Sequence, residues 1–182
     1  FGGFVGLASF LGIFFHDQYA LSKVMAGNFT ALCVFAGSFS RPFGGYLADR
    51  FGGVRMLSLL FGAVSILMLS MGFLPPLAAA TLLIFLGMTC LGMGNGAVFQ
   101  LVPQRFRKEI GVVTGIVGAA GGAGGFFLPT FLGFFKDLAG SYGVGFVIFG
   151  CASLSALVIL RIVQEGWTFP RIFSEISPAF PG

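Results

Sequence analysis

The amino-acid sequence predicts an all-α membrane protein. Hydrophobic residues make up 57% of its 182 residues and charged residues only 9%, whereas an average soluble domain has roughly 25% charged residues. Its apolar stretches are about 20 residues long, which is enough for a helix to cross ~30 Å of hydrocarbon. A soluble domain of this length could not bury so much apolar surface, so we expect a lipid bilayer around much of the chain.

Breakers and charged segments divide the chain into six predicted transmembrane helices. We expect residues 1–163 to form a six-helix bundle and residues 164–182 to form a cytoplasmic or membrane-surface tail. The chain opens in an apolar run, without a Met or a signal peptide, so we expect a fragment that lacks its N-terminal part. The predicted spans are residues 1–15, 24–48, 56–73, 77–102, 110–135 and 143–163.

The distribution of Lys and Arg predicts the orientation. One side of the predicted bundle carries seven basic residues, and the other side carries only Lys23 and Lys136. We expect the richer side, and with it the C-terminus, to be cytoplasmic in a multi-pass plasma or inner membrane protein. The net charge of +4 comes from scattered residues, which does not indicate nucleic-acid binding. The seven residues are Arg50, Arg55, Arg105, Arg107, Lys108, Arg161 and Arg171.

The remaining basic residue, Arg41, falls inside the second predicted span, eight residues before Asp49. At ~1.5 Å per residue it lies ~12 Å from the cytoplasmic end, close to the membrane midplane. An arginine there costs ~2.5–3.5 kcal/mol on insertion scales. None of the six acidic residues is predicted at that depth, so the positive charge of Arg41 needs a partner from elsewhere.

Two interpretations of Arg41 are open. It bonds backbone carbonyls or an acid in the missing part of the protein, or its partner is an anionic ligand. A guanidinium is a planar fork of donors that is always charged, and it suits flat oxyanions. Pro42 frees a backbone carbonyl one turn earlier and favours a kink, while Ser38 and Ser40 add polar groups nearby.

Glycines gather in the fourth and fifth predicted spans. Gly118 with Gly122, and Gly121 with Gly125, form two G-x-x-x-G pairs, which are typical of close helix packing in membranes. An alternative is that this bare backbone approaches a small ligand. In the fourth span, Asn95 and Gln100 are uncharged hydrogen-bonding groups that serve either a ligand or a neighbouring helix. The related glycine stretch of that span is Gly92, Gly94 and Gly96.

The other reactive side chains argue against an enzyme or a metal protein. Cys33, Cys90 and Cys151 all fall inside apolar spans, which argues against disulfides and metal ligation. No nucleophile, base or metal cluster gathers in the spans, so we expect neither catalysis nor a cofactor. His16 is predicted outside the membrane, so the residues leave proton coupling and anion exchange both open.

The loop after the second span reads GYLADRFGGVR. It resembles the cytoplasmic G-x-L-a-D-r-x-G-x-[KR] signature of the major facilitator superfamily, with matches at Gly45, Asp49, Arg50 and Gly52 and with the final basic residue, Arg55, one position later than the pattern has it. The resemblance implies that the Asp49 carboxylate pairs with nearby arginines and helix N-termini and holds an inward gate.

Two longer strings resemble the nitrate/nitrite porter family within that superfamily. SRPFGGYLADRFGG, residues 40–53, contains Arg41, and GIVGAAGGAGGFFLP, residues 115–129, resembles the family's second nitrate signature. The opening FGGFVG is similar to the family's seventh helix. The resemblance covers nearly the whole chain up to about Val163.

The family resemblance implies a twelve-helix carrier, of which this chain is the C-terminal six helices. In that family the nitrate or nitrite lies between two arginines, one from each half, and Arg41 matches the second. Phe1 matches an aromatic residue that packs on the anion, and Gly121 and Gly122 fall in the motif beside the substrate path. We add Asn95 to this candidate site as an uncharged hydrogen-bonding group.

The expected function is nitrate or nitrite transport by alternating access, feeding nitrate assimilation or respiration. The expected partners are the anion, the missing six-helix half and the lipid bilayer. One rival is a carrier for another small anion such as a carboxylate, which needs the same arginine but a roomier pocket. A second rival is a membrane interaction module without transport, in which the glycines only pack helices; the lone buried Arg41 argues against it.

Overall fold

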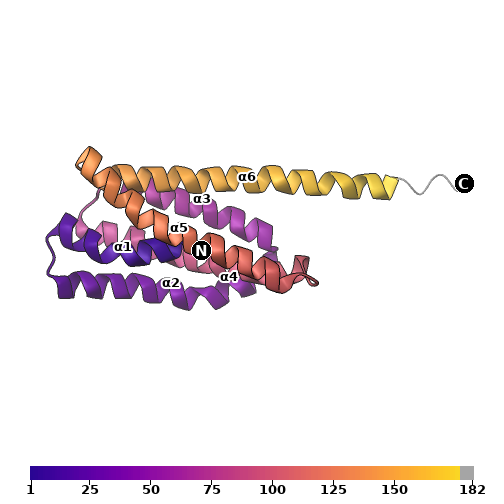
Figure 1. Cartoon of the computed structure of the whole chain (residues 1–182), viewed down its shortest axis with the longest axis horizontal. Helices are drawn as coiled ribbons and strands as arrows, with labels where there is room; N and C mark the ends of the chain where they lie inside the picture. Colours follow the sequence, from indigo (N-terminus) through magenta and orange to yellow (C-terminus); the bar gives the residue numbers. More distant parts are fainter. Residues whose placement is uncertain (177–182) are drawn as a thin grey trace, which may run out of the picture.

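The computed structural model describes the backbone of residues 1–176, and the side chains of residues 1–164 other than that of Arg105. Within this part of the chain it confirms the predicted all-α class with six helices. They form an elongated bundle in which α2 and α6 lie on opposite sides (Figure 1). The helices are α1 Gly2–Tyr19, α2 Lys23–Phe51, α3 Gly53–Met71, α4 Leu77–Arg105, α5 Ile110–Ala139 and α6 Gly143–Ile176.

Several helices run beyond their predicted ends. The segment after Phe15 was expected to be a loop, yet α1 continues to Tyr19, whose hydroxyl donates to the Pro75 carbonyl at 2.7 Å. The α6 helix continues past its predicted end at Val163 to Ile176, and it extends beyond its neighbours in Figure 1. The start of the predicted tail is therefore helical, and its last residues, 177–182, lie outside the described residues.

Four helices of the described chain are long and apolar enough to cross a membrane, judged by length and composition. The other two predicted spans do form helices, but α1 includes the polar residues His16 and Asp17, and α2 includes Arg41, Asp49 and Arg50. These side chains lower the apolar character of both helices. The four qualifying segments are Gly53–Met71, Leu77–Gln104, Ile110–Ala139 and Gly143–Gln164.

The core consists of two hydrophobic clusters at different heights of the bundle. The larger one is aromatic, and in it the Phe14 ring meets Tyr142 and Phe146 edge-on, with centroids 5.5 and 5.1 Å away. The smaller one includes Ala48 of α2 and Ala97 of α4. Such edge-to-face pairs add to area burial in fixing the helix ends.

Helices α2 and α4 meet backbone to backbone along a line of glycines. A β-carbon at Gly44 would overlap the backbone of Met93, and one at Gly92 would overlap the Gly37 carbonyl. The small residues that the sequence indicated for close packing in α4 therefore serve that purpose. The result is that Arg41 on α2 and Asn95 on α4 are held on adjacent helices.

Candidate functional site

Three residues of the predicted site share one groove. Phe1, Arg41 and Asn95 line a groove of about 750 Å³ together with Phe99, and Asp49 and Gln100 line it too. These residues come from the start of α1, from α2 and from α4. The groove therefore brings together a cation, two aromatic rings and hydrogen-bonding groups from segments far apart in the sequence.

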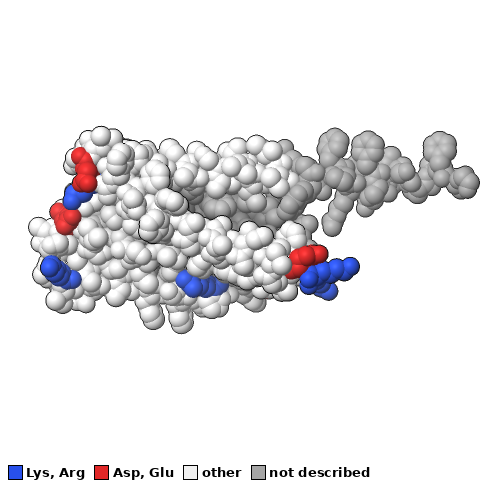
Figure 2. Space-filling view, viewed as in Figure 1, with Lys and Arg blue, Asp and Glu red and all other residues white. Residues whose placement is uncertain are grey.

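Arg41 is the basic residue in the middle part of α2, and α2 continues through Pro42. Charged side chains gather at the two ends of the bundle, with one basic group midway between them (Figure 2). The guanidinium carbon of Arg41 lies 4.6 Å from the centre of the Phe4 ring, a cation–π contact. Its Nε is buried without a hydrogen-bond partner, and among the described side chains no carboxylate forms an ion pair with it.

Asn95, on the neighbouring helix α4, lines the same groove and has a second unsatisfied group. The residue is only 3% exposed, and its Oδ1 atom has no hydrogen-bond partner. Buried polar atoms are nearly always hydrogen-bonded in native proteins. Arg41 and Asn95, two residues that line this groove, therefore each carry a buried polar atom whose hydrogen-bonding capacity is unused within the described residues.

Phe1 forms the aromatic wall of the groove, and Gly121 of α5 supports it. The Phe1 ring meets Phe99 edge-on at 6.2 Å and 78°. A β-carbon at Gly121 would overlap the Phe1 ring, whereas one at the adjacent Gly122 would meet only open space. The described residues thus connect Gly121 to the groove through Phe1, and they do not bring Gly122 to it.

The Asp49 carboxylate lies at the end of the groove nearest the α2–α3 loop, and two glutamine amides of α4 hold it. Gln100 Nε2 donates to both carboxylate oxygens, at 2.8 and 2.9 Å, and Gln104 Nε2 donates to Oδ1 at 2.8 Å. The resemblance implied arginine partners, but neither Arg50 nor Arg55, both exposed, forms an ion pair with Asp49. Among the described side chains, the partners of the Asp49 carboxylate are therefore these two glutamine amides.

The remaining two residues of the gating signature are the glycines Gly52 and Gly45. Gly52 has a φ of +91° and ends α2, with its N–H donating to the Ala48 carbonyl at 3.0 Å. A side chain is strained at this φ, so glycine is required for the tight passage into α3. Gly45 lies on α2 beside Gly96 and lines the groove.

Sequence reasoning missed Gln104 and the pairing of both glutamines with Asp49. A signal was present, because Gln100 and Gln104 are four residues apart and so lie on the same face of α4. Two long amides on one helix face can reach one carboxylate on the neighbouring helix. That spacing did not reveal which helix was the neighbour.

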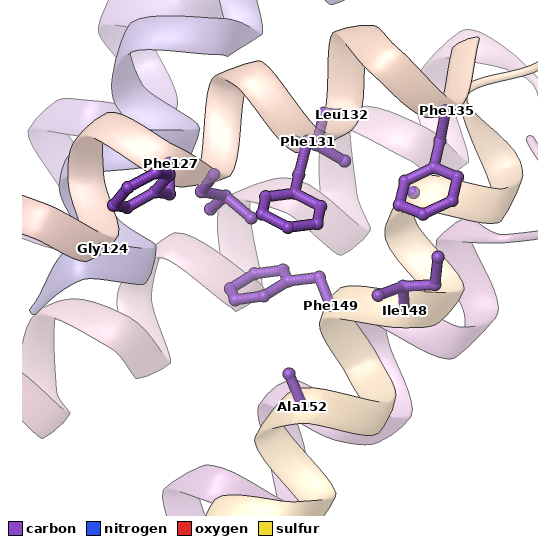
Figure 3. Close-up of a pocket in the computed structure, with 10 residues that line it drawn as sticks. Gly124, Phe127, Phe131, Leu132, Phe135, Ile148, Phe149 and Ala152 are labelled. Atoms are coloured by element: carbon purple, nitrogen blue, oxygen red, sulfur yellow. The ribbon is translucent and has the colours of Figure 1, made fainter. Parts of the chain in front are cut away.

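A second pocket, of about 270 Å³, lies between α5 and α6 and is unsuited to an anion. Figure 3 shows the rings of Phe127, Phe131 and Phe135 on α5 across from Phe149 and Ala152 on α6. Every residue that lines it is apolar. An anion there would lose its hydration without gaining a hydrogen-bond donor, so the groove at Arg41 is the better candidate.

A polar cluster joins three helices at the opposite end of the bundle from Asp49. Lys136 Nζ and the Tyr142 hydroxyl each donate to Asp17 Oδ2 at 2.9 Å. The hydrogen bonds from Lys136 and then from Tyr142 lower the pKa of the Asp17 carboxyl. The cluster ties the ends of α1 and α5 to the start of α6.

Comparison with known proteins identifies the family of the chain. The model of the Major Facilitator Superfamily matches residues 1–129, which is well over half of the sequence. The chain belongs to the Major Facilitator Superfamily. The matched region includes α1 to α4 and the glycine-rich part of α5, so the groove at Arg41 falls within the part that defines the family.

Several curated relatives of this chain have names that refer to nitrate or nitrite. It is 34% identical to the nitrite extrusion protein of Bacillus subtilis (strain 168) over 88% of its length. It is 34% identical to the probable nitrate transporter NarT of Staphylococcus epidermidis, again over 88%. It is 33% identical to the probable nitrate/nitrite antiporter NarK1 of Thermus thermophilus over 91%. The resemblance to nitrate/nitrite porters is thereby confirmed.

The relatives are much longer than this superfamily chain. The matched part makes up 40% of the Bacillus protein, 42% of the Staphylococcus protein and 43% of the Thermus protein. The chain that contains the groove at Arg41 thus spans about two fifths of the length of these relatives.

Proposed function

We propose that this chain is the C-terminal six-helix half of a carrier that moves nitrate or nitrite across a cell membrane by alternating access. All six helices cross the bilayer, with the α2–α3 loop and the C-terminus on the cytoplasmic side. The excess of Lys and Arg on that side supports this orientation. The substrate anion binds at Arg41, in the groove between α1, α2 and α4.

One observation carries the proposal: Arg41 is a cation in the groove with a buried donor that lacks a partner. A buried charge without a counter-charge is costly, so such groups are normally paired. A small anion in the groove supplies the missing counter-charge. The fork of the guanidinium favours a flat oxyanion that accepts two hydrogen bonds in one plane.

The chemistry of the walls supports nitrate or nitrite over a larger anion. The Phe1 and Phe99 rings present flat apolar surfaces beside Arg41, which suit a thin, weakly hydrated anion. The named relatives include a nitrite extrusion protein and a probable nitrate transporter. Asn95 of α4 adds a neutral hydrogen-bonding side chain to the lining of the groove.

A second six-helix half is proposed to cover the exposed side of the groove. The supporting observation is a line of four glycines on α5 at which an added β-carbon would meet open space in the described chain. Their spacing of three or four residues places them on one helix face. A facing helix can approach closely there. The glycines are Gly111, Gly115, Gly118 and Gly122.

Uptake into proteoliposomes tests the proposed function with the full-length protein that contains this chain. Vesicles loaded with unlabelled nitrate are expected to accumulate isotope-labelled nitrate faster than empty vesicles, and nitrite is expected to compete. Formate and acetate test the rival carboxylate carrier. Competition by acetate as strong as that by nitrite would favour that rival, and an absence of labelled uptake would contradict transport altogether.

A further inference from the structure

The contact between α2 and α4 has few interlocking side chains around Arg41. Gly37 and Gly44 on α2 lie against the backbone of α4, and Gly96 on α4 lies against the carbonyl of Arg41. In most helix pairs, side-chain ridges that fit into grooves define how one helix is placed along the other. Two surfaces made largely of glycine backbone allow close approach but provide few such ridges.

Two polar contacts flank Arg41 and replace the missing ridges. On one side, the Ser40 hydroxyl contacts the Gly37 carbonyl on its own helix at 2.9 Å and the Thr89 carbonyl on α4 at 3.0 Å. On the other side, two turns further along α2, the Asp49 carboxylate accepts the amides of Gln100 and Gln104. Polar contacts of this kind join helices in membranes where apolar packing gives little specificity.

We propose that Gln100 is a positioning residue for the anion site, which acts by holding Asp49. Its amide fixes how far α2 is displaced along α4, and this displacement sets the position of Arg41 relative to Asn95 in the groove. This role rests on the proposed binding of an anion at Arg41. Asp49 thereby has a structural partner, Gln100, within its own half of the carrier, in addition to any role of Asp49 in a gate.

The geometry distinguishes the contributions of the two glutamines. Gln100 Nε2 bridges both oxygens of Asp49, whereas Gln104 reaches only Oδ1. Loss of the Gln100 amide leaves Oδ2 without its donor, and hydrogen bonds to a charged group are stronger than those between neutral groups. Gln100 also lines the groove, so direct contact between its amide and the anion is the alternative that the experiment must separate.

A double-mutant cycle on the purified full-length protein separates positioning through Asp49 from direct contact between Gln100 and the anion. The measurement is the equilibrium affinity for nitrate, taken together with the melting temperature, for the wild type, Gln100→Leu, Asp49→Ala and the double variant. Gln100→Leu is expected to weaken binding by about fivefold or more. In the Asp49→Ala background the same change is expected to alter affinity by less than about twofold, because the two residues then no longer interact.

An equal loss of affinity in both backgrounds would overturn the positioning role and favour direct contact with the anion. Unchanged affinity in Gln100→Leu would overturn it as well. The matched control is Thr81→Val on α4. The Thr81 hydroxyl donates to the Leu77 carbonyl of its own helix, its one hydrogen bond among the described residues, and its loss is expected to leave nitrate affinity unchanged. If the wild type binds neither nitrate nor nitrite, the proposed function fails, and the positioning role with it.

A second variant keeps the role testable if Asp49→Ala does not fold. The double exchange Asp49→Asn with Gln100→Glu retains both side-chain lengths and reverses donor and acceptor. It is expected to bind nitrate more tightly than Gln100→Leu and within about threefold of the wild type, because a charged hydrogen bond is restored. Binding no tighter than that of Gln100→Leu would overturn the role.

Discussion

The carbonyl oxygen of Arg41 lies against the α-carbon of Gly96, so the helix with the proposed anion ligand meets α4 without an intervening side chain. Two residues earlier on the same helix, Gly94 has more room. A methyl group there would lie 3.8 Å from Leu60 Cδ1, an ordinary van der Waals contact. The two glycines share one helix but differ in what a side chain would meet.

This difference predicts the effects of two alanine substitutions in the full-length protein. Gly96→Ala forces α2 and α4 apart and is expected to cost about 1–3 kcal/mol, as overpacking does, and to weaken nitrate binding. Gly94→Ala is expected to leave both the melting temperature and the affinity close to those of the wild type. Equal melting temperatures for the two variants would contradict the close approach at Gly96.

Gly121 is predicted to act through the Phe1 ring. A methyl group at Gly121 overlaps that ring, so Gly121→Ala is expected to displace Phe1 into the groove and to lower nitrate affinity several-fold. The control is Gly133→Ala on the same helix, where the added group meets open space in the described residues. Isothermal titration calorimetry with nitrate measures the affinity of both variants. Unaltered affinity in Gly121→Ala would show that Phe1 is not part of the site.

Much of the fold, and part of the candidate site, could be predicted from the sequence. Apolar length and breakers predicted six helices, because the cost of burying unpaired backbone in lipid leaves few alternatives. Arg41 could be singled out as a candidate anion ligand because a charged residue within an apolar span needs a partner. The partners of Asp49 could not be predicted, since they depend on which helices are adjacent and how they are displaced. The different surroundings of Gly121 and Gly122 depend on helix rotation, which the glycine spacing does not reveal.

Acid is predicted to weaken the polar cluster around Asp17. Its carboxyl has a lowered pKa in the folded protein, so its contribution to stability is present above the ordinary pKa of about 3.9 and is lost as the pH falls through the folded value. Asp17→Asn is therefore expected to lower the melting temperature at pH 7, and only modestly because the pair is partly exposed. This difference from the wild type is expected to shrink below about pH 4.

Asp137→Asn is the control for that change, because this neighbouring acid is exposed and forms no ion pair among the described side chains. It is expected to show no such dependence on pH. An Asp17→Asn melting temperature equal to that of the wild type at pH 7 would contradict a stabilising role for the cluster.

Cysteine labelling is predicted to place the two ends of the bundle on opposite sides of the membrane. Arg107→Cys, in the loop between α4 and α5, is expected to react with an impermeant maleimide only from the cytoplasm. Asp137→Cys, near the end of α5, is expected to react only from outside. Both are made in a full-length protein in which every native cysteine, including Cys33, Cys90 and Cys151, is replaced by alanine. The reverse pattern would contradict the orientation inferred from the excess of basic residues.

The most direct test of the anion site is the equilibrium binding of nitrate to purified full-length Arg41→Lys. Lysine keeps the positive charge but loses the planar fork of donors, so the affinity is expected to fall about tenfold or more, which corresponds to ~1.4 kcal/mol. Membrane yield and melting temperature are expected to stay near those of the wild type, and Arg107→Lys is expected to bind normally. Wild-type nitrate affinity in Arg41→Lys would contradict the assignment of Arg41 as the anion ligand.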